Sequence, residues 1–177
     1  EWINENVGPG TIMLTDNHWT EGVPNLHRYN ERQIPIFEDD DIKKMRILSN
    51  NLSHAQYIIF YSNFTYGSIN RVPERFPLSS NYYRKLFSGE LGYEFEKSFT
   101  SYPSLLGISL KNDIFNRANL PEPKQMHKSL QPGFVINLGY ADDNVANYDH
   151  PTVMIFKNTR LLSKEQLTSK LTSLDDS

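Results

Sequence analysis

The sequence contains no cysteine among its 177 residues. Disulfide bonds, thiolate nucleophiles and zinc sites with cysteine ligands are therefore excluded together. The same absence leaves the cellular compartment open, because it is a disulfide framework, rather than the lack of one, that points to a particular redox environment.

Long apolar runs and an excess of positive charge are also missing. No stretch approaches the roughly 18–20 apolar residues of a membrane span, and the chain does not open with a secretion signal. The net charge is −3, which gives no electrostatic reason to expect a nucleic-acid partner. Because the chain starts at Glu1, within an apparent helix, we expect it to be a piece of a longer protein.

The short motifs of common active sites are absent as well. Neither phosphate-binding spacing, G-x-x-x-x-G-K-[ST] or G-x-G-x-x-G, occurs, and the glycines at 8–10 precede a strand rather than a helix. The chain has no G-x-S-x-G nucleophile elbow and no H-E-x-x-H zinc motif. We therefore expect no cofactor and no metal ion.

What remains is the composition and pattern of a globular domain. Hydrophobic residues make up 38% and charged residues 22% of the chain, and the length suffices for one domain with a core. Apolar runs typical of buried strands alternate with amphipathic segments. This order predicts one three-layer α/β domain with a mostly parallel sheet, helices on both faces and one antiparallel hairpin. We expect a soluble domain over 1–160, with a long irregular insertion at 112–148, and a helical tail over 161–177.

The expected elements follow from periodicity and from turn residues. Strands are expected at 11–15, 33–38, 56–63, 93–103, 105–110, 134–140 and 152–158. Helices are expected at 1–7, 39–55, 81–92 and 163–174, the last beginning with a capping box. In the third, Gly89 is a favourable C′ stop, and the apolar face consists of Tyr82, Tyr83, Leu86 and Phe87. The second helix should bury Ile42, Met45, Leu48 and Leu52. Residues 64–80 are expected to form a loop, with Ser79 or Ser80 capping the helix that follows.

The first group of candidate site residues follows the first expected strand. Asp16, His18 and Trp19 lie where open α/β sheets place their ligands. A tryptophan beside a histidine and an acid is suited to stacking on a sugar and bonding its hydroxyls. The alternative is that Trp19 only covers the edge of the sheet.

A second group follows the central expected strand. Arg71 and Arg75 have the chemistry to clamp a phosphate or carboxylate, although we favour a role as scaffolding for an irregular loop. Tyr66, Tyr82 and Tyr83 are candidates for stacking on sugar faces.

The third group is Asp149-His150-Pro151, directly before the last expected strand. Proline restricts the preceding histidine to extended geometry, and the aspartate can close a turn onto nearby backbone N–H groups. We therefore favour a structural turn. Two alternatives stay open, a metal site that combines Asp16, His18 and His150, and a hydrolase or transferase site that adds Asp149 to these three.

Three stretches together resemble a known family: WINENVGPGTIMLTDNHW (2–19), residues 55–103 from AQYIIFYSNFTYG to SFTSYP, and YDHPTVMIFKN (148–158). They are similar to the C-terminal extracytoplasmic region of multi-pass membrane proteins of the YYY-type group and its relatives among the dolichyl-phosphate-mannose-type (GT-C) glycosyltransferases. The likeness covers most of the chain in order and spacing. It departs between Asn112 and Tyr148, where this chain is longer.

The resemblance implies a place rather than a reaction. Such a domain would follow the last membrane span and would lie on the extracytoplasmic face, tethered by spans outside this sequence. In that family the catalytic acid lies between early membrane spans and the donor is a lipid-linked sugar, so no catalytic residue carries over to this chain. The implied partners are the transmembrane part of the same protein and a glycan or lipid-linked sugar.

We therefore expect a non-catalytic domain of a membrane-embedded glycosyltransferase-like protein, which covers the membrane bundle or aids acceptor binding. One alternative is a free-standing carbohydrate-binding or interaction module. The other is a small α/β hydrolase or transferase.

Overall fold

The structure is a computed structural model of the whole chain. It describes residues 1–16, 26–99, 104–105, 108–111, 114–123, 126, 134–137 and 152–173.

Five strands form the main sheet, in the order β2-β1-β3-β8-β4. Their bounds are Ile12–Asp16 (β1), Asn30–Ile34 (β2), Tyr57–Phe60 (β3), Tyr93–Phe99 (β4) and Val153–Asn158 (β8). β2 and β3 both lie parallel to β1. β8 is antiparallel to both of its neighbours, β3 and β4. It follows that β8 alone runs against the other four strands, so the predicted mostly parallel α/β sheet is confirmed.

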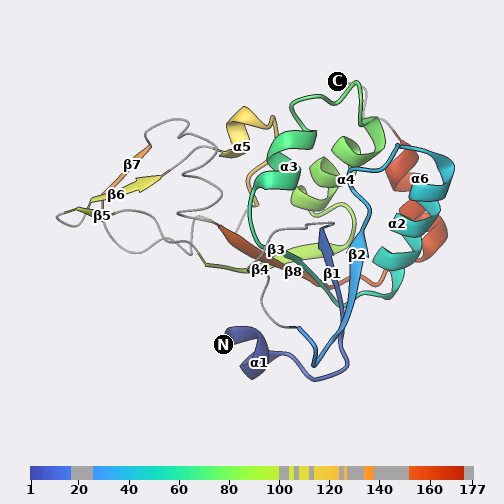
Figure 1. Cartoon of the computed structure of the whole chain (residues 1–177), viewed down its shortest axis with the longest axis horizontal. Coiled ribbons are helices and arrows are strands. Elements are labelled where there is room, and N and C mark those ends of the chain that lie inside the picture. The colour runs from blue at the N-terminus through green and yellow to red at the C-terminus, as the bar shows by residue number, and fades with distance from the viewer. Residues whose placement is uncertain are drawn as a thin grey trace.

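Six helices are described, and they are distributed unequally over the two faces of the sheet (Figure 1). Their bounds are Trp2–Asn6 (α1), Ile42–His54 (α2), Phe64–Ile69 (α3), Pro77–Phe87 (α4), Ile114–Arg117 (α5) and Lys164–Thr172 (α6). α2, α3, α4 and α6 lie on one side of the main sheet, and the one-turn helix α1 lies on the other.

The larger core lies between the sheet and this thicker helical layer, and aromatic rings fill its centre. Phe60 of β3 is surrounded by four rings at centroid distances of 5.8 to 5.9 Å, those of Tyr66, Tyr83, Phe87 and Phe156. All four pairs are tilted or edge-to-face, and the ring quadrupoles favour such arrangements over a face-to-face sandwich. Phe60 itself is 1% exposed.

The opposite face carries a smaller core beneath α1. Val7, Met13, Tyr29, Ile59 and Ile155 are buried there. The periodicity of strands explains the division, because neighbouring residues such as Ile58 and Ile59 point to opposite faces. Burial on both faces accounts for the unbroken apolar run of β3 and confirms its predicted central position.

The second helix forms where it was predicted, but its buried face is different. Asp41 caps α2, and its side chain accepts a hydrogen bond from the backbone N–H of Lys44. Leu48 and Leu52 are buried as expected. The expectation for Ile42 was wrong, because this side chain is 66% exposed and the buried residue of the first turn is Lys44.

Residues 64–69 form helix α3 rather than the expected loop. The helix is only six residues long and contains a threonine, two aromatics and a glycine, none of which favours a helix strongly. Tertiary contacts hold it, since Thr65, Tyr66 and Ile69 are all buried.

The start of α4 also differs from the expectation. The helix begins at Pro77, with proline in its first turn, and Ser79 and Ser80 lie buried within it. Neither serine is the N-cap. Asp40 supplies the missing acceptor from another segment, because its carboxylate accepts from the backbone N–H and the hydroxyl of Ser79, at 3.0 and 2.7 Å.

The end of α4 is where the sequence placed it. Gly89 adopts a φ of +82°, a conformation that glycine reaches without strain. The backbone N–H of Gly89 donates to the carbonyl of Leu86, and that of Glu90 donates to Lys85. This pair of bonds is a Schellman motif.

The C-terminal helix starts with the predicted capping box. Ser163 Oγ accepts from the N–H of Gln166, and the Gln166 side chain accepts from the N–H of Ser163. Leu167 and Leu171 then face the core. At the other end of α6, Lys85 Nζ donates to the carbonyl of Ser173 at 2.8 Å, a favourable place for a cation.

Replacing Ser163 with Ala is expected to lower the free energy of unfolding by about 1 kcal/mol, because the cap is lost. The measurement is urea unfolding of both proteins at pH 7. Ser169→Ala is the matched control, since it makes the same chemical change at an exposed position inside the helix, where alanine is tolerated or favoured. Equal effects at both positions would contradict the capping argument.

Three short strands form a second sheet, which lies apart from the main sheet in Figure 1. β5 (Ser104–Leu105) pairs antiparallel with β6 (Ile108–Lys111), and β6 pairs parallel with β7 (Phe134–Asn137). The hairpin expected between 93–103 and 105–110 was wrong, because β4 pairs with β8 and the antiparallel pair β5/β6 lies after it. The segment 112–148, expected to be irregular, contains both α5 and β7.

Candidate functional site

The carboxyl ends of three neighbouring parallel strands meet at one edge of the main sheet. β1 ends at Asp16, β2 leads into Phe37 and Glu38, and β3 leads into helix α3. In open α/β sheets this edge is the usual place for a ligand. The polar and aromatic groups on these three segments are therefore the natural place to look for a site.

Asp16 is the most unusual side chain at this edge. It is only 6% exposed. Its Oδ2 atom accepts hydrogen bonds from the hydroxyl of Thr65 on α3 and from the hydroxyl of Tyr83 on α4, the latter at 3.1 Å. Its Oδ1 atom has no hydrogen-bond partner among the described residues.

Burial raises the pKa of Asp16 from 3.8 to about 7, because an ionised carboxylate is poorly solvated there. The hydrogen bonds from Thr65 and Tyr83 act in the opposite direction and lower it. A carboxyl group that changes charge near neutral pH, in a sheet-edge position, is a feature of functional sites as well as of strained cores.

The three tyrosine candidates lie in the core rather than at the surface. Tyr66, Tyr82 and Tyr83 are each 0% exposed, and their rings pack against other aromatic rings. The role expected for them, an exposed face that stacks on a sugar, is therefore corrected. Burial also raises the pKa of Tyr82 and of Tyr83, so both hydroxyls stay protonated and can act as donors.

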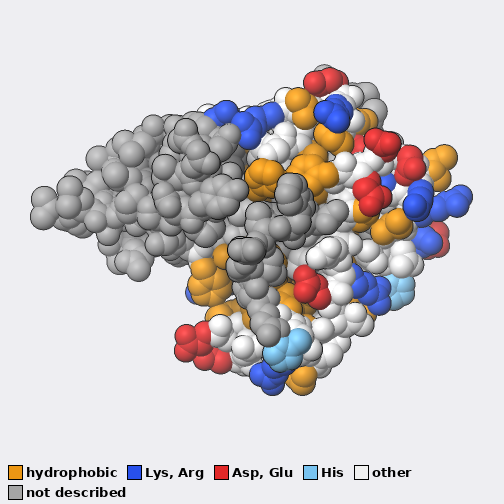
Figure 2. Space-filling model, in the orientation of Figure 1, with side chains coloured by type: hydrophobic (Ala, Val, Ile, Leu, Met, Phe, Trp, Pro, Cys, Tyr) orange, Lys and Arg blue, Asp and Glu red, His pale blue; other side chains and the backbone are white. Residues whose placement is uncertain are grey.

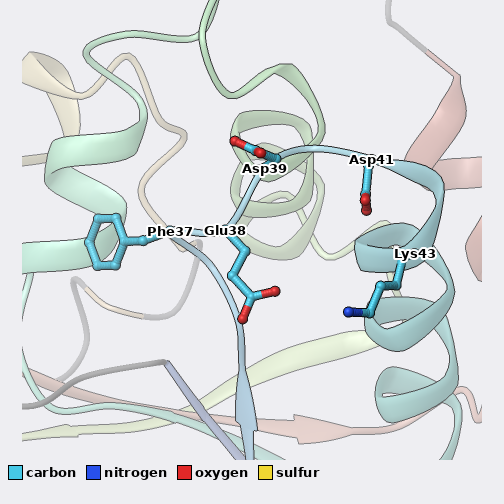
Figure 3. Close-up of a pocket in the computed structure, with 5 residues that line it drawn as sticks. All are labelled: Phe37, Glu38, Asp39, Asp41 and Lys43. Carbon is cyan, nitrogen blue, oxygen red and sulfur yellow. The ribbon is translucent and has the colours of Figure 1, made fainter.

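A pocket of about 350 Å³ lies beyond the end of β2. Its lining residues are Phe37, Glu38, Asp39, Asp41 and Lys43. Figure 3 shows the carboxylate of Glu38 and the amine of Lys43 pointing toward each other, while Phe37 points away from the other four. The pocket therefore offers both an acceptor and a donor group to a polar molecule.

Phe37 connects this pocket to the segment around Asp16. Its ring packs against that of Phe64 on α3, at a centroid distance of 5.8 Å. Phe64 is 37% exposed, so the pair presents an aromatic surface at the sheet edge, and the next residue, Thr65, bonds to Asp16. In Figure 2 hydrophobic side chains are visible on this face of the molecule, near acidic ones.

A buried ion pair fixes the segment that forms the pocket. Lys44 Nζ donates to Asp40 at 2.7 Å and to the backbone carbonyls of Ile36 and Glu38, at 2.6 and 2.8 Å. Both charged side chains are almost fully buried, at 1% and 4% exposure. The Lys44 ammonium group donates three hydrogen bonds, one of them to a carboxylate, so its buried charge is fully compensated.

The two arginine candidates lie on the exposed segment after α3. Arg71 Nε donates to the carbonyl of Gly67 at 2.8 Å, and Arg75 lies over the ring of Phe76 at 5.2 Å. Both contacts are made within the same segment, and the scaffolding role and the anion-clamp role both stay predictions.

The remaining candidates lie outside the described residues. They are His18, Trp19, Asp149, His150 and Pro151. The two composite sites that combine Asp16 with these residues therefore stay predictions. In the ranges that the structure describes, no group of three or more histidine, aspartate or glutamate side chains is placed to hold a metal ion.

Three members of the site were not expected from the sequence. Phe64 and Thr65 were placed in a loop, and Glu38 was taken as the end of a strand. A signal for Thr65 did exist, because it follows the central strand at the edge where Asp16 was expected. The pairing of the two could not be anticipated without the order of the strands.

Comparison with known proteins adds no relative. No protein-family model, no curated protein and no solved structure matches this chain. Among the helices in the described part, none has the length and apolar character needed to cross a bilayer.

Proposed function

We propose that the chain is a non-catalytic, glycan-contacting domain of a membrane-embedded glycosyltransferase-like protein. It would lie on the extracytoplasmic face, next to the transmembrane part of the same protein. There it would cover the membrane bundle and help to bind the acceptor.

The proposal draws on the resemblance and on the site together. The three resembling stretches supply β1, β3, α3, α4, β4 and β8, so the likeness concerns the framework of the main sheet. The resemblance also suggests an extracytoplasmic setting in which glycans are the relevant ligands.

The observation that carries the proposal is the gathering of groups at the carboxyl edge. An exposed aromatic ring, Phe64, packs on Phe37, and Phe37 is one of the residues that line the same pocket as the Glu38 carboxylate, although its ring points away from that carboxylate. Aromatic rings supply the apolar surface against which a sugar ring packs. Carboxylates accept hydrogen bonds from sugar hydroxyls. Both kinds of group therefore suit a neutral glycan.

The test is glycan binding by the isolated chain, first on an array and then by calorimetry with any glycan retained. Glu38→Gln and Phe64→Ala are each expected to weaken binding about tenfold, through loss of a charge-assisted hydrogen bond and of a packing surface respectively. Glu74→Gln, an exposed loop position, is the matched control and should leave binding unchanged.

Two results would contradict the proposal. One is an array on which no glycan is retained, because the chain would then not bind the proposed ligand. The other is glycosyl transfer by the isolated chain, which would make it an enzyme in its own right.

A carbohydrate-binding module without an enzymatic parent is the second candidate, and the same exposed aromatic ring favours it. The complete gene separates the two: a series of hydrophobic spans ahead of this sequence supports the first candidate, and a gene without them supports the second.

A further inference from the structure

The pocket beyond β2 carries opposite charges on facing walls. The carboxylate of Glu38 and the amine of Lys43 point toward each other across it, and the carboxylate of Asp41 points toward the same space (Figure 3). Glu38 and Lys43 both lie in the described part of the chain, and no ion pair is recorded between their side chains. The cavity therefore separates an acceptor from a donor, and both can bind a molecule that enters it.

The pocket as a whole is acidic. Its lining holds three carboxylates and one amine, which gives a net charge of −2. The neighbouring Lys44 does not change this balance, because its buried charge is paired with that of Asp40. A cationic group is therefore favoured in the pocket over a neutral one, and an anionic group is disfavoured.

The two carboxylates that face the cavity are carried by a fixed backbone. Lys44 Nζ donates to the backbone carbonyl of Glu38 at 2.8 Å. Asp41 Oδ1 accepts from the backbone N–H of Lys44 at 2.7 Å, so the cap of α2 uses one carboxylate oxygen and leaves Oδ2 for a ligand. Walls that are already in place lower the ordering cost of binding.

An amino sugar has groups that complement each of these charges. Its ammonium group can donate to the two carboxylates, and the hydroxyl next to the ammonium group carries an oxygen that can accept from Lys43. The volume of about 350 Å³ is at the lower end of the range for small-molecule sites, which suits a single sugar residue. An N-acetylated sugar keeps the ring but lacks the positive charge, and a uronic acid carries a charge of the wrong sign.

We propose that the pocket selects glycans that carry a free amino group next to a hydroxyl, with the ammonium group bound by Glu38 and Asp41 and the hydroxyl by Lys43. The inference rests on the glycan-binding function proposed above and adds the class of glycan to it. The aromatic surface of Phe37 and Phe64 suits any sugar ring, so the preference comes from the charges of the pocket.

The test compares three sugars that differ at one position only. They are the methyl β-glycosides of glucosamine, of N-acetylglucosamine and of glucose, each titrated into the isotope-labelled chain at about pH 6 and followed by the NMR signals of the backbone amides of residues 37–43. The glucosaminide is expected to bind about tenfold more tightly than the other two, because it alone forms charge-assisted hydrogen bonds to carboxylates. The preference should shrink as the salt concentration rises, since charges at an open pocket are screened.

Two variants locate the preference within the pocket. Glu38→Gln and Asp41→Asn each remove one negative charge, and each should reduce the preference to about threefold or less. Asparagine remains a good N-cap, so the second variant keeps the start of α2 intact. Glu74→Gln is the matched control, because it removes one negative charge at an exposed position of another segment and should leave the tenfold preference unchanged.

Cyclohexylamine tests the part assigned to Lys43. It has a six-membered ring and an ammonium group but no hydroxyl, so Lys43 gains no acceptor when it binds. It is expected to bind about tenfold more weakly than the glucosaminide. Lys43→Met should remove most of this difference.

Equal affinities for the three glycosides would overturn the inference. A preference that survives in both carboxylate variants, or that disappears in Glu74→Gln, would overturn it too, as would equal binding of cyclohexylamine and the glucosaminide. Retention of neutral glycans without any preference for an amine would refute this inference and leave the proposed function standing. The absence of binding by every glycan would instead refute the proposed function itself.

Discussion

Asp16→Asn is expected to stabilise the protein at pH 8 by up to about 4 kcal/mol. The figure follows from a pKa that burial raises from 3.8 to about 7, at about 1.4 kcal/mol per unit. Asparagine keeps the shape of the side chain and an oxygen that can accept from Thr65 and Tyr83, but it carries no charge to bury. A stabilising substitution of a buried acid would be an uncommon result, since most substitutions in a core destabilise.

The sign of the pH dependence is fixed by the direction of the shift. Because the pKa is higher in the folded state, the unfolded chain loses its proton first as the pH rises. The contribution of Asp16 to stability is therefore complete below about pH 4, falls between pH 4 and 7, and is constant above that. The difference between the variant and the natural protein should grow over the same interval.

The measurement is urea unfolding of the two proteins between pH 4 and pH 8. Asp39→Asn is the matched control, because it makes the same chemical change at an exposed acid, where the effect should stay within about 0.5 kcal/mol. A difference between the natural protein and Asp16→Asn that does not change with pH would show that the charge of Asp16 is not what destabilises the fold. An acid that weakens its own fold is typical of positions retained for function.

Asp40→Ala is expected to lower the free energy of unfolding by about 3–5 kcal/mol. The change leaves the buried charge of Lys44 without its carboxylate partner. The loss of one member of a buried ion pair typically lowers the free energy of unfolding by this amount. It also removes both bonds to Ser79 that cap α4. The measurement is again urea unfolding, at pH 7.

The neighbouring acid offers a sharp comparison. Asp41→Ala removes only the N-cap of α2, because the Asp41 side chain accepts a single hydrogen bond, from the Lys44 N–H. It should lower the free energy of unfolding by about 1 kcal/mol. In addition, Lys44→Met placed on top of Asp40→Ala should recover part of the loss, because no charge is then stranded. Equal effects of the two adjacent aspartates, or no recovery in the double variant, would contradict this account.

The sequence was a good guide wherever local chemistry decides the structure. The capping box at Ser163 and the stop at Gly89 depend on neighbours a few residues apart, and the apolar run of β3 can be read from consecutive residues. The strand expected at 33–38 lies at Asn30–Ile34 instead, so that it stops before Pro35, and it is at an edge of the sheet, where proline is tolerated.

The errors lie where contacts outside the apolar pattern of the element itself decide. The first turn of α2 buries Lys44 rather than Ile42, because backbone carbonyls and Asp40 surround the amine. An amphipathic pattern cannot reveal that, since it counts lysine as polar. Helix α3 likewise depends on contacts outside itself, notably the bond from Thr65 to Asp16, 49 positions earlier in the chain.

The candidate site likewise includes residues that the sequence could predict and contacts that it could not. Asp16 could be predicted, because a polar residue after a buried strand has a defined place in an α/β sheet. The sequence indicated the burial of Tyr82 and Tyr83 only in part. Both belong to the expected apolar face of their helix, but both were also taken as candidates for stacking on a sugar. Their proximity to Asp16 was not visible, because it requires α4 to lie over the end of β1.

The pairing of β4 with β8 has a consequence for how this chain could be cut and rejoined. Phe99, at the end of β4, lies directly opposite Val153, at the start of β8. The chain thus leaves the main sheet and returns to it at a single point, and the two strands would form an ordinary hairpin if a short turn joined them. The described part of the segment between them contributes Phe115, Ala118, Leu120 and Met126 to the larger core. A shortened chain with a tight turn in place of residues 100–152 would therefore keep the pairing of β4 with β8 but would need four new apolar side chains to close the core.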